Sequence, residues 1–479
     1  MFKDQIIKLV GKVVNSSDIS IEAIENESFG DYSSNMAMVM AKKEGKNPRQ
    51  LAEEISSKLN SDKSLGEIVE KVEVAGPGFV NFWLKKDVLV DNLISIDREK
   101  EKYGISDSGK GKTVIVEYSS PNIAKPFTVG HLRSTIIGDA VANLFQAVGY
   151  KVLRDNHLGD WGTQFGKQIY AIKAWGDEDK IGKSDNPVKE LVSLYVKFHE
   201  EAEKDESLED GAREWFKKLE NGDVEARRMW QMCIDWSFIE FDKIYSKLGI
   251  KFSKEFQDGR GLGESFFEGR MQVVIDELTK KGLLKEGKEG ARLVFFKDDK
   301  YPPAMIVKKD GTSLYHTRDL ATDKYRKEKY NPDLVVNEVG IEQKLYFEQL
   351  YEMEKLLGWY KPGQRVHVGH GLIRFKEGKM STRKGNVVWM EEVLGEAEKR
   401  ASKLGSKEKG LNEMVAIGAL KYNDLKRESK TEVVFDWDEI LNMEGNSGPY
   451  LQYAYARIQS VLGKSKKKTF DKFDSTELN

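Results

Sequence analysis

A strand, a stiff loop and a helix follow one another between residues 113 and 147, and this segment most constrains the fold. The apolar, β-branched run at 113–116 predicts a buried strand. Apolar residues with helical spacing occupy 136–147, and the loop before them, residues 119–134, reads SSPNIAKPFTVGHLRS. Its two prolines keep the connection extended, because the residue before a proline avoids the α region. We therefore expect a helix to begin near Thr128.

The start of this helix is a predicted anion site. Backbone N–H groups and the positive end of the helix dipole would lie there. Gly130 would let a flat ligand approach the backbone, and Lys125 and His131 would add positive charge. Together these features favour a polyphosphate ligand such as ATP. The Gly-His pair taken alone is better explained as an ordinary helix start with a surface histidine.

A second loop is short and basic, and it reads GKMSTRKGN at residues 378–386. It has three cations within six residues, between glycines, which suits a mobile clamp on phosphates. The alternative is a solvated basic turn, which is the usual fate of such a run of charges.

Bulk properties exclude several classes of protein. The 479 residues suggest about two to four domains. The formal net charge of −2 means that a nucleic-acid partner would need local basic patches. The single cysteine, Cys233, excludes a disulfide framework and a Cys-cluster zinc site, and we predict no metal-ligating residues. No segment reads as a membrane span or a leader peptide, so we expect a cytoplasmic protein without a membrane partner.

Residues 1–110 are predicted to form a small N-terminal α/β domain. Helical patterns occupy 2–14 and 48–59, and residues 72–74 suggest a strand. The Gly-Pro-Gly turn at 76–78 lies between apolar runs and predicts a hairpin.

Residues 111–395 alternate strand-like and helix-like segments. This pattern predicts an α/β fold with a doubly wound parallel sheet of the Rossmann type and a ligand at the carboxyl ends of its strands. The charged stretch at about 173–254 is predicted to be a helical insertion. Residues 396–479 are predicted to form an all-helical segment.

The two loops together resemble the HIGH and KMSKS signatures of class I aminoacyl-tRNA synthetases. With LGDWGTQFG at 158–166, the chain resembles arginyl-tRNA synthetases over essentially its whole length. Residues 29–35 resemble the appended tRNA-binding domain of that family, and 435–437 and 444–457 resemble the entry to its anticodon-binding domain. We expect that last domain to be incomplete at Asn479.

The resemblance implies ATP-dependent ligation of L-arginine to tRNA(Arg) through arginyl-adenylate, with release of pyrophosphate and AMP. It implies ATP and arginine as substrates, Mg²⁺ as a cofactor, tRNA(Arg) as the partner, and a monomeric ligase of protein biosynthesis.

Two strand-end carboxylates, Glu117 and Asp319, are candidates for binding a guanidinium. Tyr315 and Asp319 are four residues apart and would share a helical face, so that the ring could cover a cation. An ion pair between Asp319 and Arg318 or another basic residue is an equally good reading of the sequence alone. The resemblance favours arginine binding and adds Asn122 and Gln343 to the same site.

The resemblance also implies nucleotide-binding and catalytic residues. The ATP-binding residues would be Gly130, His131, Gly340, Glu342, His370, Lys379, Met380 and Ser381. The catalytic residues would be Thr128, Lys125, His131, Lys379 and Lys384.

The sequence departs from the signatures at two positions. Thr128 replaces the first histidine of HIGH, and a threonine can donate a hydrogen bond but carries no charge. Loss of one donor to a transition state costs on the order of 10²–10³-fold in rate. Thr382 replaces the second lysine of KMSKS, and either Lys125 or Lys384 could substitute for it.

Two rival functions follow from these observations. Thr128 is also compatible with a non-catalytic, tRNA- or arginine-binding paralogue, although the retained candidate residues argue against a degenerate site. Another class I synthetase is the third reading. A cysteine-specific enzyme would need zinc-binding cysteines, and a glutamate- or glutamine-specific enzyme would need a basic residue in place of Glu117 or Asp319.

Overall fold

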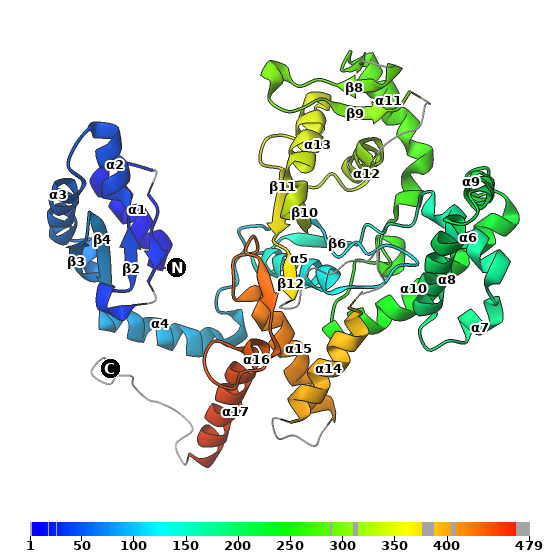
Figure 1. Cartoon of the computed structure of the whole chain (residues 1–479). Coiled ribbons are helices and arrows are strands. Elements are labelled where there is room, and N and C mark those ends of the chain that lie inside the picture. The colour runs from blue at the N-terminus through cyan, green and yellow to red at the C-terminus, as the bar shows by residue number, and fades with distance from the viewer. Residues whose placement is uncertain are drawn as a thin grey trace. The chain divides into compact units, whose positions relative to one another are not determined.

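The computed structural model describes residues 2–17, 19–24, 26–287, 290–309, 315–375, 388–403 and 409–465. The chain divides into two compact units, of which unit 1 is formed mainly by Met1–Gly104 and unit 2 by Ile105–Gly463 (Figure 1). Each unit contains at least one separate cluster of buried apolar side chains.

Unit 1 is a four-stranded antiparallel sheet covered by helices, with strand order β1-β2-β4-β3. Both predicted helices are present, and β3 pairs with β4 across the Gly-Pro-Gly turn, which confirms the predicted hairpin. Val72 and Phe82 of the sheet share one buried cluster with Ile6 and Ile55 of the helices. The elements are α1 (Phe2–Val14), β1 (Glu22–Ala23), β2 (Tyr32–Ser34), α2 (Met36–Glu44), α3 (Pro48–Ser61), β3 (Val69–Ala75), β4 (Phe79–Leu84) and α4 (Lys86–Glu99).

Unit 2 is built on a four-stranded parallel sheet with strand order β11-β10-β5-β6, which confirms the predicted fold class. Alternate residues of β5 bury on opposite faces, because Val114 and Val116 belong to one apolar cluster and Ile115 to another. Helices therefore cover both faces of the sheet (Figure 1). The elements are β5 (Thr113–Glu117), α5 (Val129–Ala147), β6 (Lys151–Asp155), α12 (Tyr315–Tyr330), β10 (Leu334–Gly340), α13 (Lys344–Leu357) and β11 (Arg365–His370).

The connection after β5 leads to β6 on one side, while β10 pairs with β5 on the other side. Strand order therefore reverses between β5 and β10. In open α/β sheets the crevice at such a switch point, outside the carboxyl ends of the strands, is where ligands bind.

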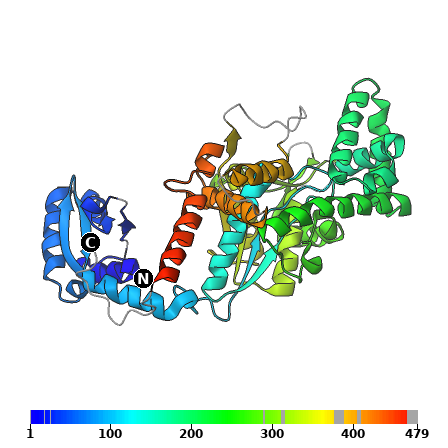
Figure 2. The same cartoon turned by 90° about the horizontal axis from the view of Figure 1, so that it is seen from below.

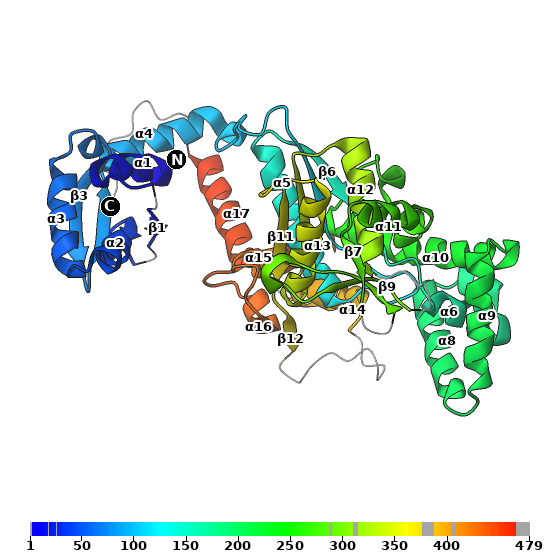
Figure 3. The same ribbon diagram turned by 90° about the horizontal axis from the view of Figure 1, so that it is seen from above.

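Helices occupy the stretch where a helical insertion is predicted, and they project from the rest of unit 2 (Figures 2 and 3). Its longest helix, α10, shares the large apolar cluster of the parallel sheet through Phe241 and Ile244. The elements are α6 (Gln164–Trp175), α7 (Glu178–Gly182), α8 (Pro187–Ala202), α9 (Ser207–Glu220) and α10 (Val224–Leu248).

Between the insertion and α12 lies a small three-stranded antiparallel sheet that the sequence reading did not predict. Its strands are only three or four residues long, so they lack the apolar runs by which a strand is recognised. The elements are α11 (Met271–Lys280), β7 (Leu284–Glu286), β8 (Arg292–Val294) and β9 (Ala304–Val307).

The last segment is mostly helical, but the prediction of helices throughout is wrong at one place. Residues 433–435 form strand β13, which pairs in parallel with β12 over three residues. A strand this short is stabilised by its partner rather than by its own sequence pattern. The elements are β12 (Ile373–Phe375), α14 (Met390–Ser402), α15 (Lys409–Leu425), β13 (Val433–Phe435), α16 (Trp437–Ile440) and α17 (Gly448–Lys464). No described helix is long and apolar enough to span a membrane.

Candidate active site

The loop after β5 is held in an unusual backbone conformation. Ser119, Ser120 and Ala124 have φ angles of 73°, 45° and 57°, in the left-handed region that non-glycine residues rarely adopt. Such positions cost of order 1–3 kcal/mol each and persist only where the surroundings fix them. Here the Ser119 N–H donates to Ser134 Oγ at 3.0 Å, and the Ala124 N–H donates to Ser237 Oγ at 2.9 Å. Helices α5 and α10 therefore position the loop.

Helix α5 begins after Thr128, as predicted, and this first turn orients His131. The Thr128 N–H donates to His131 Nδ1 at 3.0 Å, so Nδ1 is an acceptor and Nε2 carries the proton of the neutral ring. Burial, together with the charges of Lys125 and His370, lowers the pKa of His131 to about 4. The prediction that His131 adds positive charge is therefore wrong at neutral pH, where the ring is a neutral hydrogen-bond donor.

The other predicted residues of this loop have different degrees of exposure. Lys125 and Gly130 are exposed, whereas Asn122 is half-buried and forms a bridge with Gly159. A Cβ on Gly130 would meet only Thr128 Oγ1, at 3.6 Å, so no described residue crowds the backbone there. A ligand can therefore reach the start of α5.

One further piece of chain meets this loop. Thr128 bridges to Trp389, and the Met390 N–H donates to the Phe127 carbonyl at 2.9 Å. The residues that follow the basic loop in the sequence are thereby attached to the start of α5. The predicted residues of the basic loop itself, Lys379, Met380, Ser381 and Lys384, lie outside the described residues.

The carboxyl ends of β10 and β11 supply the next group of predicted residues. Gly340 ends β10, and Glu342 and Gln343 follow it, exposed, in a short 3₁₀ turn (Ile341–Gln343). His370 ends β11, and its Nδ1 lies 2.7 Å from Glu338 Oε1. The structure thus brings Gly340, Glu342, Gln343 and His370 to the same edge of the sheet as the loop after β5.

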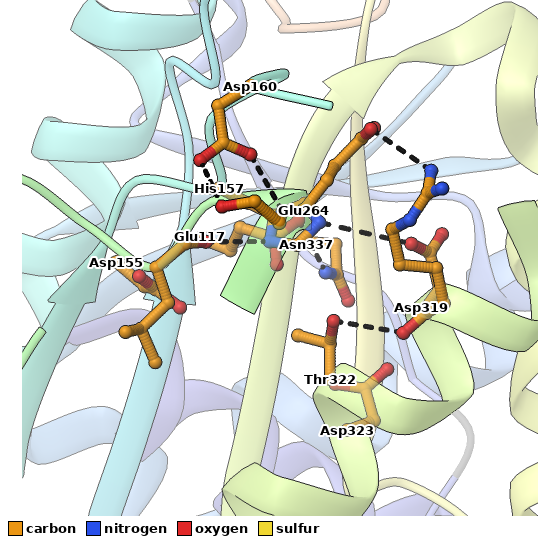
Figure 4. Close-up of polar contacts among 12 residues, drawn as sticks. Glu117, Asp155, His157, Asp160, Glu264, Asp319, Thr322, Asp323 and Asn337 are labelled. Atoms are coloured by element: carbon orange, nitrogen blue, oxygen red, sulfur yellow. Dashed lines mark hydrogen bonds and ion pairs between the residues drawn. The ribbon is translucent and has the colours of Figure 1, made fainter. Parts of the chain in front are cut away.

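An acidic cavity lies at the switch point, with about 240 Å³ of empty space that includes part open to solvent. Figure 4 shows its side chains gathered from β5, from the chain after β6 and from α12. Its lining includes Glu117, His157, Asp319, Asn337, Phe347 and Leu350.

Glu117 is already engaged by an internal guanidinium. Arg326 donates to Glu117, to Asp155 Oδ2 at 2.6 Å and to Asp323 Oδ1 at 3.1 Å, and its side chain is 1% exposed. Asn337 donates to the second oxygen of Glu117 at 3.0 Å. Burial opposes ionisation of Glu117, but Arg326 and His157 outweigh it and hold the pKa of the carboxyl below its usual range.

Asp319 has a different environment, because no buried arginine pairs with it. Tyr346 donates a hydrogen bond to Asp319 Oδ2, and His157 Nε2 lies 4.0 Å from Oδ1. His157, which is a cation only when its ring is protonated, is the only basic residue within ion-pair distance of Asp319 among the described residues. Burial raises the pKa of Asp319, and the Glu117 and Asp323 carboxylates raise it further, against the opposing effects of His157 and Tyr346.

The alternative of an ion pair between Arg318 and Asp319 is not realised. Arg318 pairs instead with Glu264, at 3.0 Å, and with Glu268, at 2.8 Å. Asp319 therefore faces the cavity with its charge unpaired by a lysine or arginine of the described chain.

Tyr315 begins α12 and is 67% exposed, and it does not line the cavity. The tyrosine that contacts Asp319 is Tyr346, on α13, which sequence reasoning missed. It also missed His157, Arg326 and Asn337. A buried strand end followed by a histidine was the only signal that could have pointed to His157.

Two family models match the chain. The model described as the arginyl tRNA synthetase N terminal domain matches residues 1–84, and the model described as tRNA synthetases class I (R), catalytic domain, matches residues 92–437.

Curated relatives match over nearly the whole chain. The arginine–tRNA ligase of Halothermothrix orenii is 42% identical over 495 aligned positions, which cover 100% of this chain and 84% of the relative. The arginine–tRNA ligase of Clostridioides difficile is 43% identical over 453 positions, which cover 93% of this chain and 77% of the relative.

Solved structures have the same fold. The arginyl-tRNA synthetase of Plasmodium falciparum superposes with a TM-score of 0.75 at 27% identity, over 97% of this chain and 81% of that one. The Thermus thermophilus arginyl-tRNA synthetase, at 22% identity, has a TM-score of 0.76 over 100% and 84% of the two chains, which is a likeness of fold alone.

Proposed function

The chain belongs to the arginyl-tRNA synthetase family of class I tRNA synthetases, and on this premise we propose that it joins L-arginine to tRNA(Arg) with ATP. The proposed amino-acid specificity rests on the Asp319 carboxylate, which lies in an acidic cavity and pairs with no lysine or arginine of the described chain. A guanidinium would supply the missing cation, because charge-assisted bonds to a carboxylate give both energy and direction.

We propose that Asp319 pairs with the substrate guanidinium while Glu117 acts mainly through Arg326. Support comes from their environments, since Glu117 already accepts hydrogen bonds from Arg326 and Asn337. His157 also lines the cavity. Its Nδ1–H donates to the Leu262 carbonyl at 3.1 Å, which would fix the ring, and its Nε2 has no hydrogen-bond partner among the described residues. Tyr315, Asn122 and Gln343 remain proposed arginine contacts from the family resemblance.

ATP would bind at the start of α5 and at the ends of β10 and β11. We propose that His131 donates from Nε2 to a phosphate oxygen, which its Nδ1 hydrogen bond to Thr128 favours. Gly130 would allow close approach of the phosphates, and exposed Lys125 would add positive charge. Gly340, Glu342 and His370 would contact the nucleoside part, and Lys379, Met380, Ser381 and Lys384 would clamp the phosphates.

The chemistry would take place in two steps. An oxygen of the arginine α-carboxylate forms a bond to the α-phosphorus of ATP, and the bond to pyrophosphate breaks, which gives arginyl-adenylate. The 2′-hydroxyl of the terminal tRNA nucleotide then bonds to the arginyl carbonyl carbon, its proton is lost, and AMP leaves. Phosphoryl and acyl transfer of this kind depend on positioning and charge neutralisation, so no nucleophilic side chain is needed.

Mg²⁺ would accompany ATP. Among the residues that the structure describes, no three His, Cys, Asp or Glu side chains form a group that could hold a metal ion. Mg²⁺ often binds through substrate phosphates and water with few protein ligands, so the residues present fit an ion that ATP carries. The ion would neutralise charge on the departing pyrophosphate.

Arginine-dependent ATP–pyrophosphate exchange in the presence of tRNA(Arg) tests the proposal. We expect exchange with arginine and none with lysine, glutamine or cysteine, because among these side chains only the guanidinium is a cation that can form two parallel bonds to one carboxylate. A chain that binds arginine or tRNA without catalysing exchange would instead be the non-catalytic paralogue.

A further inference from the structure

Arg133 is a buried arginine whose partners come from distant parts of the chain. It lies on α5, two residues after His131, and its side chain is 0% exposed. It donates to the Gly371 carbonyl at 2.8 Å and to the Ser429 carbonyl at 2.9 Å, and its Nε lies 3.0 Å from Asp424 Oδ1. A buried guanidinium is costly unless it is paired and hydrogen-bonded, so these contacts constrain its whole neighbourhood.

The partners of Arg133 belong to segments that border the nucleotide site. Gly371 directly follows His370 and begins the turn from β11 to β12, and the basic loop comes next in the sequence. Asp424 lies on α15, and Ser429 lies between α15 and β13. The Gly371 N–H also donates to the Ser429 carbonyl, at 2.9 Å, and β12 pairs with β13. The helical segment is thus joined to the strand that leads into the basic loop.

The adjacent residue of α5 makes a second cross-link. Ser134 Oγ donates to Glu338 Oε2 at 2.5 Å, and the other oxygen of Glu338 lies 2.7 Å from His370 Nδ1. Two neighbouring side chains of α5 therefore fix the helix to the ends of β10 and β11. These contacts therefore also fix the position of His131, which lies in the first turn of the same helix.

We propose that Arg133 is a positioning residue for ATP, which holds the start of α5, the turn at Gly371 and helix α15 in one fixed arrangement. The proposal rests on the proposed function and goes beyond it, because it makes α15 of the helical segment part of the support of the nucleotide site. Arg133 touches neither substrate, since its guanidinium is covered by the described chain. A displacement of about 1 Å in such support costs up to roughly 10²-fold in rate.

The test uses the full chain, with exchange measured in the presence of tRNA(Arg) and ATP affinity measured separately by equilibrium dialysis. The double variant Arg133→Met/Asp424→Leu removes both charges, and apolar replacement of a buried pair is often neutral or stabilising. We expect its ATP affinity and its kcat/KM for ATP to fall by about 10–100-fold, with KM for arginine unchanged. Arg133→Lys keeps the charge without the planar fork and should show a smaller loss of the same kind.

The matched control is Glu396→Gln, which removes exposed ion pairs with Arg400 (2.7 Å) and Lys399 (3.6 Å) on α14. It should leave both KM values unchanged.

Two checks establish that folded proteins are compared: the wild-type chain must bind ATP, and the double variant must show normal thermal unfolding. An unchanged ATP affinity in the folded double variant would overturn the inference. So would a loss of kcat with both KM values unchanged, because that pattern indicates only a smaller active fraction. Absence of wild-type exchange would reject the proposed function, whereas the dialysis comparison would still decide the role of Arg133.

Discussion

At the scale of single residues, the arginine site depends on one carboxylate that no lysine or arginine of the described chain pairs with. The two carboxylates Glu117 and Asp319 lie in one cavity, but of these two Arg326 pairs only with Glu117. Asp319 retains a side chain that is 27% exposed and a single basic neighbour, His157, at 4.0 Å. An incoming guanidinium therefore finds one carboxylate available and one already neutralised.

Substitution of Asp319 tests this difference directly. Asp319→Asn keeps the shape and removes the charge, and we expect kcat/KM for arginine to fall by roughly 30–5,000-fold, because loss of one partner of a buried charge pair costs about 2–5 kcal/mol. KM for ATP should stay within twofold. Steady-state exchange kinetics measure both values, and Glu328→Gln, an exposed position on the same helix, is the control. An Asp319→Asn enzyme with the wild-type KM for arginine would contradict the assignment.

The protonation state of His131 gives a second prediction. Burial and the nearby Lys125 and His370 charges lower its pKa to about 4. The ring is therefore neutral above pH 5, and the unfolded chain, with an ordinary histidine pKa near 6.5, binds the extra proton between pH 4 and 6.5. This group thus makes the free energy of unfolding rise with pH across that window. We expect NMR titration of the free protein to show no protonation of His131 between pH 5.5 and 8, and a midpoint near 6.5 would contradict the account.

Individual residues were predicted from the sequence only where their neighbours in the chain gave the signal. Glu117 at a strand end and Thr128 at a helix start both follow from local pattern. The prediction that Asp319 lies at a strand end is wrong, because Asp319 lies in helix α12. The ion pair between Arg326 and Glu117 could not be predicted from local pattern. The two residues are 209 positions apart in the sequence, and only the tertiary fold brings them together. The charge of His131 was misjudged for the same reason, since burial is not visible in the loop sequence.

At the scale of elements, α12 is joined to the parallel sheet by buried ion pairs. Arg326 links the helix to Glu117 of β5 and Asp155 of β6. Arg365 of β11 pairs with Asp323 of α12 at 2.7 Å. The same helix carries Asp319, so these pairs fix the wall of the cavity.

Removal of the central arginine should unfold this arrangement. Arg326→Met leaves Glu117, Asp155 and Asp323 buried without their shared cation, and we expect the free energy of unfolding to fall by about 3–5 kcal/mol. Urea denaturation measures the change. The control is Arg213→Met, which removes an exposed ion pair on α9 and should cost at most about 1 kcal/mol. Equal effects of the two substitutions would contradict a structural role for Arg326.

Elements with strong local pattern were predicted well, and those without it were missed. The strand at β5, the hairpin of β3 and β4, and the helices α1, α3 and α5 have periodic apolar residues and clear turn signals. Strands β7, β8 and β13 have three residues each and exist because other strands pair with them. Such elements are set by the fold around them, and sequence pattern alone cannot identify them.

At the scale of the whole molecule, the chain combines a unit that holds the candidate active site with a separately packed N-terminal unit. The buried cluster of unit 1 draws only on residues 1–89. We propose, from the family resemblance, that unit 1 binds tRNA and takes no part in the chemistry.

Deletion of residues 1–104 separates these roles. We expect KM for tRNA(Arg) to rise by roughly tenfold or more, since the loss of about 1.4 kcal/mol of binding free energy weakens binding tenfold. KM for arginine should be unchanged, because its proposed contacts all lie in unit 2. Aminoacylation assays over a range of tRNA concentrations measure both values. A deleted protein that folds and charges tRNA with the wild-type KM would refute tRNA binding by unit 1.

The most direct test of the central claim compares arginine with citrulline, its neutral near-isostere, in tRNA(Arg) charging by the wild-type chain. A site built around an unpaired carboxylate should charge tRNA with arginine and discriminate against citrulline by about 10³-fold or more in kcat/KM. Charging of both amino acids at similar rates, or of neither, would contradict an arginine site centred on Asp319.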